Sequence, residues 1–152
     1  MLREQTYKDE YVGVMTMPDT NRPLPVITEE SRPFWEGCRQ EKLLLQYCDR
    51  CQQYQFYPRL YCMQCGAENP RWVEASGRGV IYSYTIIQQN KSPEFANDTP
   101  YNVAIVQLEE GPRMLSNIVD IAPAELRVEL PVIVVFDRVT DTISLPRFKP
   151  LG

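Results

Sequence analysis

The sequence contains no histidine among its 152 residues. Histidine is the most frequent general base near neutral pH and a frequent ligand of metal ions. Any catalysis by this chain would therefore depend on Cys, Asp, Glu, Tyr or Lys side chains. We find no pair of these residues whose spacing indicates a nucleophile and its base. An independent enzyme is accordingly the least favoured of the functions considered below.

Clustered positive charge is also absent. The chain has 16 basic and 20 acidic side chains, which give a net charge of −4 and an isoelectric point of about 4.9. Residues 1–75 hold 11 acidic and 9 basic side chains and residues 76–152 hold 9 and 7, so each half has a net charge of −2. Binding to phosphate backbones depends on clustered Lys and Arg. This distribution of charge counts against a nucleic-acid partner.

Long apolar segments are missing as well. The longest apolar run is Pro131–Phe136, whereas a membrane-spanning helix needs about 20 apolar residues. The first residues, MLREQTYKDEYVG, are charged and lack the apolar region of a signal peptide. We therefore expect a cytoplasmic protein without membrane contact. Cytosolic thiols stay reduced, so paired cysteines indicate a metal site before a disulfide.

Four of the five cysteines form two closely spaced pairs. Cys48-x-x-Cys51 is followed, after ten residues, by Cys62-x-x-Cys65. Each pair places two thiolates on one turn, where both reach one ion at about 2.3 Å. The ten intervening residues are β-prone with a central proline, as a hairpin requires, and Gly66 suits the turn after the second pair. Four thiolates leave no open coordination position, so we predict a structural zinc site. Iron, as in rubredoxin, is the alternative, because soft thiolate sites accept both metals.

The fifth cysteine, Cys38, lies in a short predicted helix. Ser31 is the expected N-cap of this helix, which should end near Gln40. Phe34, Trp35 and Cys38 fall near one face. We therefore expect Cys38 to be a small buried apolar residue, since a nucleophilic role would need an activating base.

The rest of the chain has the pattern of a β-barrel. Trp72–Ala75 and Gly79–Gln88 are interpreted as one interrupted strand, and the further predicted strands are Tyr101–Leu108, Arg113–Ile121, Pro131–Val139 and Ile143–Phe148. Another strand, Leu43–Tyr47, leads into the first cysteine pair. Five barrel strands with one short helical link after the third are typical of the five-stranded Greek-key barrel that binds oligonucleotides or oligosaccharides, the OB fold.

The chain should therefore be mainly β and have three parts. Residues 1–27 form an extended, proline-containing arm, residues 28–71 form the helix and a rubredoxin-like zinc ribbon, and residues 72–152 form the barrel. Tyr82 and Tyr84 alternate within a strand and should share one face. They are interpreted as barrel core, although aromatic side chains on an OB face can instead stack nucleobases.

The combined order of motifs resembles one known family. Arg32-Pro33-Phe34-Trp35 precedes the first cysteine pair, and Tyr57-Pro58-Arg59 lies between the pairs. Gly79-x-x-Tyr82-Ser83-Tyr84-Thr85 opens the barrel, and Pro100-Tyr101 opens a strand that ends Leu108-Glu109-Glu110-Gly111. Over residues 28–149, this order is similar to that of the rubredoxin-like zinc-ribbon plus OB-fold proteins that accompany acyl-CoA enzymes.

This resemblance implies an accessory, non-catalytic subunit whose partner is a thiolase-fold protein that carries the catalytic residues. Such a subunit helps to assemble a hetero-oligomer and shapes the CoA-thioester pocket. Complexes of this kind act in archaeal mevalonate synthesis and in the breakdown of steroids, fatty acids and aromatic compounds. Apolar surface on the arm, on the helix with Phe34 and Trp35, or on the ribbon hairpin would mark the interface.

The loop 89–100, between the first two barrel strands, is the expected place of ligand contacts. Phe95 and Tyr101 are candidates for contact with pantetheine or an acyl chain, and Lys91 for contact with a CoA phosphate. Alternatively, Phe95 packs on the barrel rim and Lys91 is a solvated charge.

A nucleic-acid-binding zinc-ribbon and OB protein is the alternative function. Both modules occur in the transcription and translation machinery. A clustered positive face on the folded surface would favour this alternative.

Overall fold

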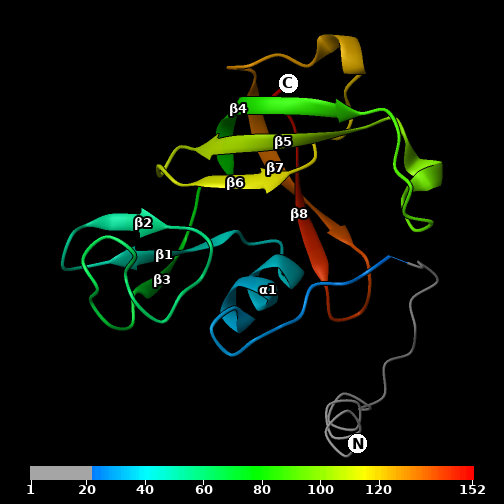
Figure 1. The fold of residues 1–152 in the computed structure, drawn as a ribbon. Helices are drawn as coiled ribbons and strands as arrows, with labels where there is room; N and C mark the ends of the chain where they lie inside the picture. Colours follow the sequence, from blue (N-terminus) through cyan, green and yellow to red (C-terminus); the bar gives the residue numbers. More distant parts are fainter. Residues whose placement is uncertain (1–21) are drawn as a thin grey trace, which may run out of the picture.

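The computed structural model describes residues 22–152, which contain one α-helix, eight strands and two short 3-10 helices (Figure 1). The elements are α1 (Arg32–Arg39), β1 (Leu44–Cys48), β2 (Gln53–Gln55), β3 (Arg71–Glu74), β4 (Arg78–Ile87), η1 (Ala96–Asp98), β5 (Tyr101–Leu108), β6 (Arg113–Ser116), η2 (Pro123–Glu125), β7 (Pro131–Arg138) and β8 (Ser144–Pro150). Within this part of the chain, no helix has the length and apolar character needed to cross a membrane. Most of the predicted arm, residues 1–21, lies outside the described residues, and its remainder, 22–27, has no regular structure.

The first sheet is the core of the predicted ribbon. Its three antiparallel strands have the order β2-β1-β3, so β1 lies in the centre. Gln46 of β1 pairs with Gln55 of β2 on one side and with Trp72 of β3 on the other. Helix α1 begins after Ser31, as predicted, and packs against β1.

The second sheet is the predicted barrel. Its five antiparallel strands have the order β6-β5-β4-β7-β8. A parallel bridge between Ile118 and Phe148 joins the segment after β6 to β8. There, the Val119 N–H donates to the Phe148 carbonyl at 2.7 Å, and the Phe148 N–H donates to the Asn117 carbonyl at 3.0 Å. The bridge connects the two edges of the sheet and curls it into a barrel, which confirms the predicted OB-type fold.

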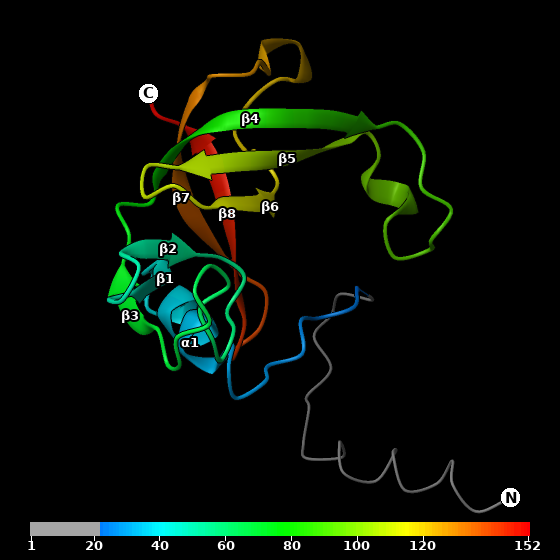
Figure 2. The same cartoon turned by 60° about the vertical axis from the view of Figure 1, so that its left-hand side comes forward.

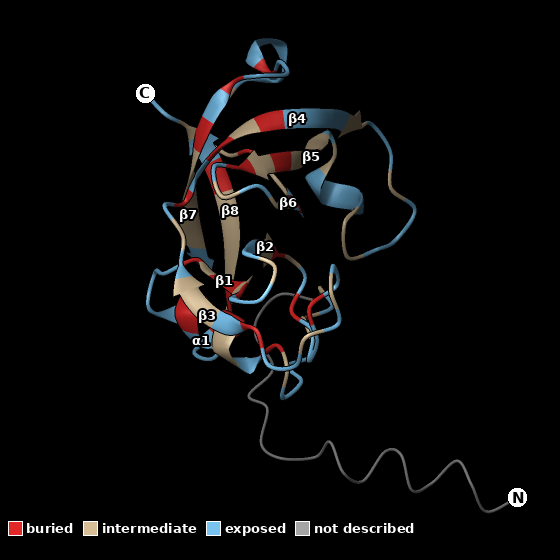
Figure 3. Cartoon of the chain, turned by 90° about the vertical axis from the view of Figure 1, so that its left-hand side faces the viewer, coloured by how far each residue is buried: buried red, intermediate tan, exposed pale blue. Residues whose placement is uncertain are grey.

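The ribbon and the barrel share one hydrophobic core. Phe34, Cys38 and Leu45 from the first part are buried in the same cluster as Ile81 and Phe148 from the barrel. Helix α1 lies beneath the barrel and contacts β7 and β8 (Figure 2). This end of the barrel is therefore filled by the helix. Figure 3 shows the contrast with the loop between β4 and β5, most of which is exposed.

The prediction of one interrupted strand at the start of the barrel is wrong. Residues 71–74 form β3, which pairs with β1 in the ribbon sheet, whereas β4 belongs to the barrel. The chain turns between the two strands at Gly77, whose φ of +75° is strained for other residues. A Cβ at Gly77 would also lie 2.6 Å from a methyl group of Val134. The third barrel strand is shorter than predicted, because residues 117–119 leave β6 to pair with β8.

The prediction that Tyr82 and Tyr84 share one face is also wrong. A register shift between Ile81 and Ser83 adds one residue to β4 at Tyr82 and breaks the alternation of faces. The guanidinium of Arg113 lies over the Tyr82 ring, 3.5 Å from its centroid, whereas the Tyr84 hydroxyl donates to the Leu126 carbonyl at 2.9 Å. Both tyrosines are exposed, so neither belongs to the buried core.

The pH dependence of stability tests the burial of Cys38. This side chain is fully buried, as predicted, and burial raises the pKa of its thiol from 9.0 to about 12. Between these values the unfolded chain loses the thiol proton while the folded chain keeps it. The protonated thiol therefore costs the folded chain nothing below pH 9. As the pH rises between the two pKa values, the free energy of unfolding falls by about 1.4 kcal/mol per pH unit.

Cys38→Ala should accordingly show a smaller fall in melting temperature between pH 9 and 11 than the natural chain. Thermal unfolding followed by circular dichroism at a series of pH values measures this difference. Parallel declines in the two proteins would contradict the assignment of the effect to Cys38.

Candidate functional site

The four paired cysteines meet in the ribbon. Cys48 ends β1, Cys51 lies in the turn before β2, and Cys62 and Cys65 lie in the loop after β2. Their Sγ atoms all lie within 4.8 Å of one another. Sγ of Cys48 lies 3.6 Å from Sγ of Cys65, and Sγ of Cys51 lies 3.5 Å from Sγ of Cys62. All four are free thiols and not disulfides.

These distances fit one tetrahedral ion. A tetrahedron with Zn–S bonds of about 2.3 Å has sulfur–sulfur edges of about 3.8 Å. The observed separations are close to that edge, and all four donors are sulfur. The donor set suits zinc or iron and leaves no vertex for water or substrate. The arrangement can cross-link two turns of the chain but cannot activate a bound molecule.

Backbone N–H groups near Cys62 favour the thiolate form that a metal requires. The backbone N–H of Cys65 lowers the pKa of the Cys62 thiol to about 6, and the N–H of Gln64 acts in the same direction. By contrast, burial raises the pKa of Cys51 to about 12. The loop closes through Gly66, whose N–H donates to the Cys62 carbonyl at 2.9 Å and whose φ is +71°, as expected after the second pair. A bound cation would favour the thiolate form of all four side chains.

A buried pair of glutamines holds the loop that carries the second cysteine pair. Nε2 of Gln55 donates to Oε1 of Gln46 at 2.7 Å. Gln46 also bonds both backbone groups of Arg59, at 2.8 and 2.9 Å, and the Met63 N–H donates to Oε1 of Gln55 at 2.8 Å. These side-chain hydrogen bonds fix the backbone of the loop at Arg59 and at Met63. The sequence analysis missed them, because their only signal is two glutamines on neighbouring strands.

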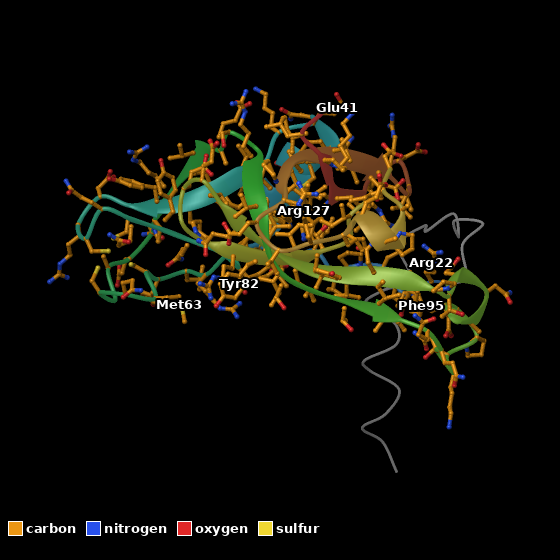
Figure 4. The ribbon with its side chains drawn as sticks, turned by 90° about the horizontal axis from the view of Figure 1, so that it is seen from above. Arg22, Glu41, Met63, Tyr82, Phe95 and Arg127 are labelled. Carbon is orange, nitrogen blue, oxygen red and sulfur yellow. The ribbon has the colours of Figure 1, made fainter. Side chains whose placement is uncertain are left out.

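Two of the three predicted contact residues lie at one cavity. Phe95 and Tyr101 line a cavity of about 850 Å³, together with Arg22 and its neighbours from the arm. Lys91 is exposed and does not line this cavity. The guanidinium of Arg22 forms an ion pair with Asp98 and lies 5.8 Å from the centroid of the Phe95 ring (Figure 4). Arg22 has no motif around it, so the sequence analysis did not select it.

The ribbon loop carries a group of exposed apolar side chains, which we name the hairpin patch. It consists of Tyr57, Leu60, Tyr61 and Met63, of which Met63 is the most exposed at 69%. Val26 and Ile27 of the arm are exposed as well. Phe34 and Trp35 are buried, so the helix, one of the three places considered for an apolar interface, does not expose these side chains. Their rings fill the space between α1 and the ribbon, where Phe34 lies 5.4 Å from the Phe56 ring.

Two family models match adjacent parts of the chain. Residues 35–71 match the rubredoxin-like zinc ribbon domain of ChsH2, and residues 72–137 match the C-terminal OB-fold domain of ChsH2.

The relatives are named as subunits or scaffold proteins. The chain is 34% identical over 133 residues to a "Probable enoyl-CoA hydratase alpha subunit" of Thermomonospora curvata, and these residues are 88% of this chain but 41% of that protein. It is 33% identical to a "DUF35 domain-containing scaffold protein" of Methanothermobacter thermautotrophicus, with 76% of this chain and 87% of that protein covered. The chain therefore spans less than half of the first relative and most of the second.

Solved structures show the same fold. A chain of the structure named "Ltp2-ChsH2(DUF35) aldolase" superposes with a TM-score of 0.76 and 32% identity, over 85% of this chain and all of that one. A DUF35 protein of unknown function from Sulfolobus solfataricus gives a TM-score of 0.60 at 18% identity, over 80% of this chain and 85% of that one. The matched domains, the DUF35 relative and the first of these structures together assign this chain to the ChsH2/DUF35 family of zinc-ribbon and OB-fold proteins.

Proposed function

We propose that the chain is a cytoplasmic, accessory and non-catalytic subunit of a thiolase-type acyl-CoA complex. The complex would form or cleave a C–C bond in a CoA thioester, as in the breakdown of aromatic compounds, steroids or fatty acids. The main support is the likeness to the whole ChsH2(DUF35) chain of the aldolase structure. The names of other relatives, "alpha subunit" and "scaffold protein", also describe components of assemblies. One of them, at 28% identity, is a "3-oxo-4,17-pregnadiene-20-carboxyl-CoA hydratase alpha subunit" of Mycobacterium tuberculosis, whose name contains a CoA thioester.

The chemistry of the chain supports a non-catalytic role. The sequence has no histidine. The thiol of Cys38 is buried and its pKa is raised to about 12, so it is a poor nucleophile near neutral pH. The other four cysteines lie together in the thiol cluster. In this proposal, the nucleophile and base belong to the thiolase-fold partner.

The thiol cluster holds a structural zinc ion in this proposal. Cys48, Cys51, Cys62 and Cys65 supply four thiolates, and the ion supplies folding energy to a ribbon with little core of its own. The hairpin patch lies on the loop that the ion fixes, so zinc would keep these apolar side chains in one arrangement for docking. We infer that the patch, together with Val26 and Ile27, forms the contact with the partner.

Replacement of one thiolate tests the role of zinc. Cys62→Ser should lose bound zinc and unfold, because zinc sites of this type contribute about 10–16 kcal/mol, which is comparable to the whole stability of a typical domain. Elemental analysis and far-ultraviolet circular dichroism measure the two effects. Cys38→Ala is the matched control and should keep its zinc. A zinc-free Cys62→Ser protein with native spectrum and partner binding would rule out the structural role.

Affinity purification tests the proposed partner. The tagged chain, isolated from an extract of its native cells, should carry a stoichiometric thiolase-fold protein that mass spectrometry identifies. Recovery of the chain alone would contradict the proposal. Recovery with RNA or DNA that salt removes would instead support the nucleic-acid alternative.

Charge substitutions in the hairpin patch test the interface. Leu60→Asp with Met63→Asp should weaken partner binding at least tenfold, because burial of the two carboxylates is costly. Val128→Asp is the control, since Val128 is also exposed (54%) and its neighbour Arg127 lies well away from Met63 in Figure 4. Surface plasmon resonance with the purified partner gives both affinities. Equal losses in the two proteins would exclude a specific role of the patch.

A further inference from the structure

We propose that the outer face of strands β4, β5 and β6 is a second docking surface for the thiolase-fold partner, and that Arg113 in this surface pairs with a carboxylate of the partner. The inference rests on the proposed function for the identity of the partner. The surface itself is defined by the described residues, and it shares no side chain with the cavity beside Phe95 or with the hairpin patch.

The alternation of side chains along β5 and β6 defines this surface. Over residues 104–108 and 113–115, buried side chains of the core alternate with more exposed ones, which therefore lie on the outer side of the sheet. In the register of the two strands, Leu115 lies opposite Ile105 and Arg113 lies opposite Gln107. Together with the exposed ring from β4, we name this set the barrel face, which consists of Tyr82, Ile105, Gln107, Arg113 and Leu115.

The barrel face exposes large apolar groups in adjacent positions. Leu115 is 67% exposed and Tyr82 is 47% exposed, and Ile105, directly opposite Leu115, is half-buried. Side chains that lie directly opposite each other in an antiparallel pair have Cβ atoms about 5 Å apart, so they form a continuous apolar area. Single exposed apolar residues are ordinary, whereas continuous areas mark protein contacts.

The ring of Tyr82 extends across β5 to reach β6. In the sheet, β5 lies between β4 and β6, and neighbouring strands are about 4.8 Å apart. The guanidinium of Arg113 nevertheless lies 3.5 Å from the centroid of the Tyr82 ring, so the two side chains meet over the outer side of β5. The register shift between Ile81 and Ser83 adds a residue to β4 at this point, and bulges of this kind re-aim side chains. The centre of the barrel face is therefore formed before any partner binds.

The chain holds Arg113 in place but does not neutralise its charge within the described residues. Nε of Arg113 donates to Oε1 of Gln107 at 2.7 Å, and the guanidinium lies against the Tyr82 ring. The amide oxygen carries no net charge, and among residues 22–152 no carboxylate forms an ion pair with Arg113. Because this hydrogen bond uses Nε, the two Nη groups can donate to an acceptor on another molecule. A carboxylate matches this planar fork of donors.

A carboxylate surrounded by apolar side chains fits the barrel face better than a nucleic acid does. Arg113 is the charged member of the barrel face, and the whole chain has a net charge of −4. A nucleic acid presents a row of phosphates and needs clustered cations, whereas one acidic side chain of a protein needs one cation. Tyrosine and arginine are also the residues that most often dominate the energy of protein interfaces.

The barrel face and the hairpin patch lie on the same side of the molecule. In Figure 4, the labelled residues Met63 and Tyr82 both lie on the side opposite Glu41. The hairpin patch is small, whereas a stable interface uses about 20–30 residues of each partner. The barrel face supplies further surface on that side. Because the ribbon and the barrel share one core, a single rigid partner would contact both surfaces together.

Charge reversal tests the pairing of Arg113. Arg113→Glu should weaken binding of the purified thiolase-fold partner about tenfold or more in surface plasmon resonance, because two carboxylates would then face each other. Arg127→Glu is the matched control, since it changes the net charge equally and Arg127 is exposed and lies away from Tyr82 in Figure 4. This control should bind like the natural chain. Equal affinities of the two variants would overturn the proposed pairing.

A second pair of variants tests the apolar part of the barrel face. Leu115→Ser should weaken partner binding about tenfold, as expected for the loss of a buried leucine side chain. Val128→Ser is its control, because Val128 is 54% exposed and lies outside the barrel face. Hydroxyl-radical footprinting of the natural chain should show that the partner protects Tyr82 and Leu115. Circular dichroism checks that all variants are folded. Unchanged binding by folded Leu115→Ser, or unchanged labelling of Tyr82 in the complex, would contradict the barrel face.

The outcomes separate this inference from the proposed function. If the natural chain captures a thiolase-fold partner and the barrel-face variants bind it equally well, the barrel face alone is refuted. If the natural chain captures no such partner, the proposed subunit role is refuted and the barrel face loses its occupant as well. If Arg113→Glu instead abolishes self-association of the chain or its retention of RNA, the occupant is a second copy or a nucleic acid, and the choice of partner is wrong.

Discussion

The convergence of four thiols on one point is the constraint on which the ribbon depends. β1 and β2 have five and three residues, too few for an isolated hairpin to be stable in water. The thiol cluster joins the turn between these strands to the loop that follows them. The glutamine pair Gln46 and Gln55 fixes the same loop from inside. Leu43 and Leu45, which flank this structure, belong to the core shared with the barrel. Loss of the cluster would therefore reach beyond the ribbon and loosen the packing beneath β7 and β8.

The shared core makes one body of two modules that are separate in the sequence. Helix α1 contacts the ribbon on one side and the barrel on the other. The hairpin patch belongs to the ribbon, whereas the cavity beside Phe95 is lined by the barrel and the arm, and the labelled residues Met63 and Phe95 lie toward opposite ends of Figure 4. The two features therefore share no side chain. A continuous core between them would keep the two surfaces at a fixed distance and orientation, as a subunit that positions a substrate requires.

Local sequence patterns predicted most of the strands and the thiol cluster. They did not predict which strands pair when the partners lie far apart in the sequence. The spacing of the cysteines and the alternation of apolar residues are local, and they predicted the cluster and four of the barrel strands closely. The position of β3 beside β1 depends on partner residues 24 to 30 positions away in the sequence, which no local pattern specifies. Tyr82 and Tyr84 were misplaced because a bulge changes the alternation without a sign in the sequence. Gln46 and Gln55 look like exposed strand residues, and only the structure shows that they bond buried backbone groups. The loop was expected to carry Phe95 and Tyr101, which do line one cavity, while the contribution of the arm to that cavity required the folded chain.

The bridge between Ile118 and Phe148 determines the order in which the ribbon and the barrel can fold during synthesis. Phe148 lies in β8, and β8 both pairs with β7 and completes the barrel through this bridge. The sequence between Arg32 and Glu74 contains every strand of the ribbon and all four thiols. The ribbon can therefore acquire its metal while the rest of the chain is still on the ribosome, whereas the barrel must wait for its last strand. Until then, Phe34 and Trp35 have only part of their final packing, so the interval between the two events is when the nascent chain exposes most of its apolar surface.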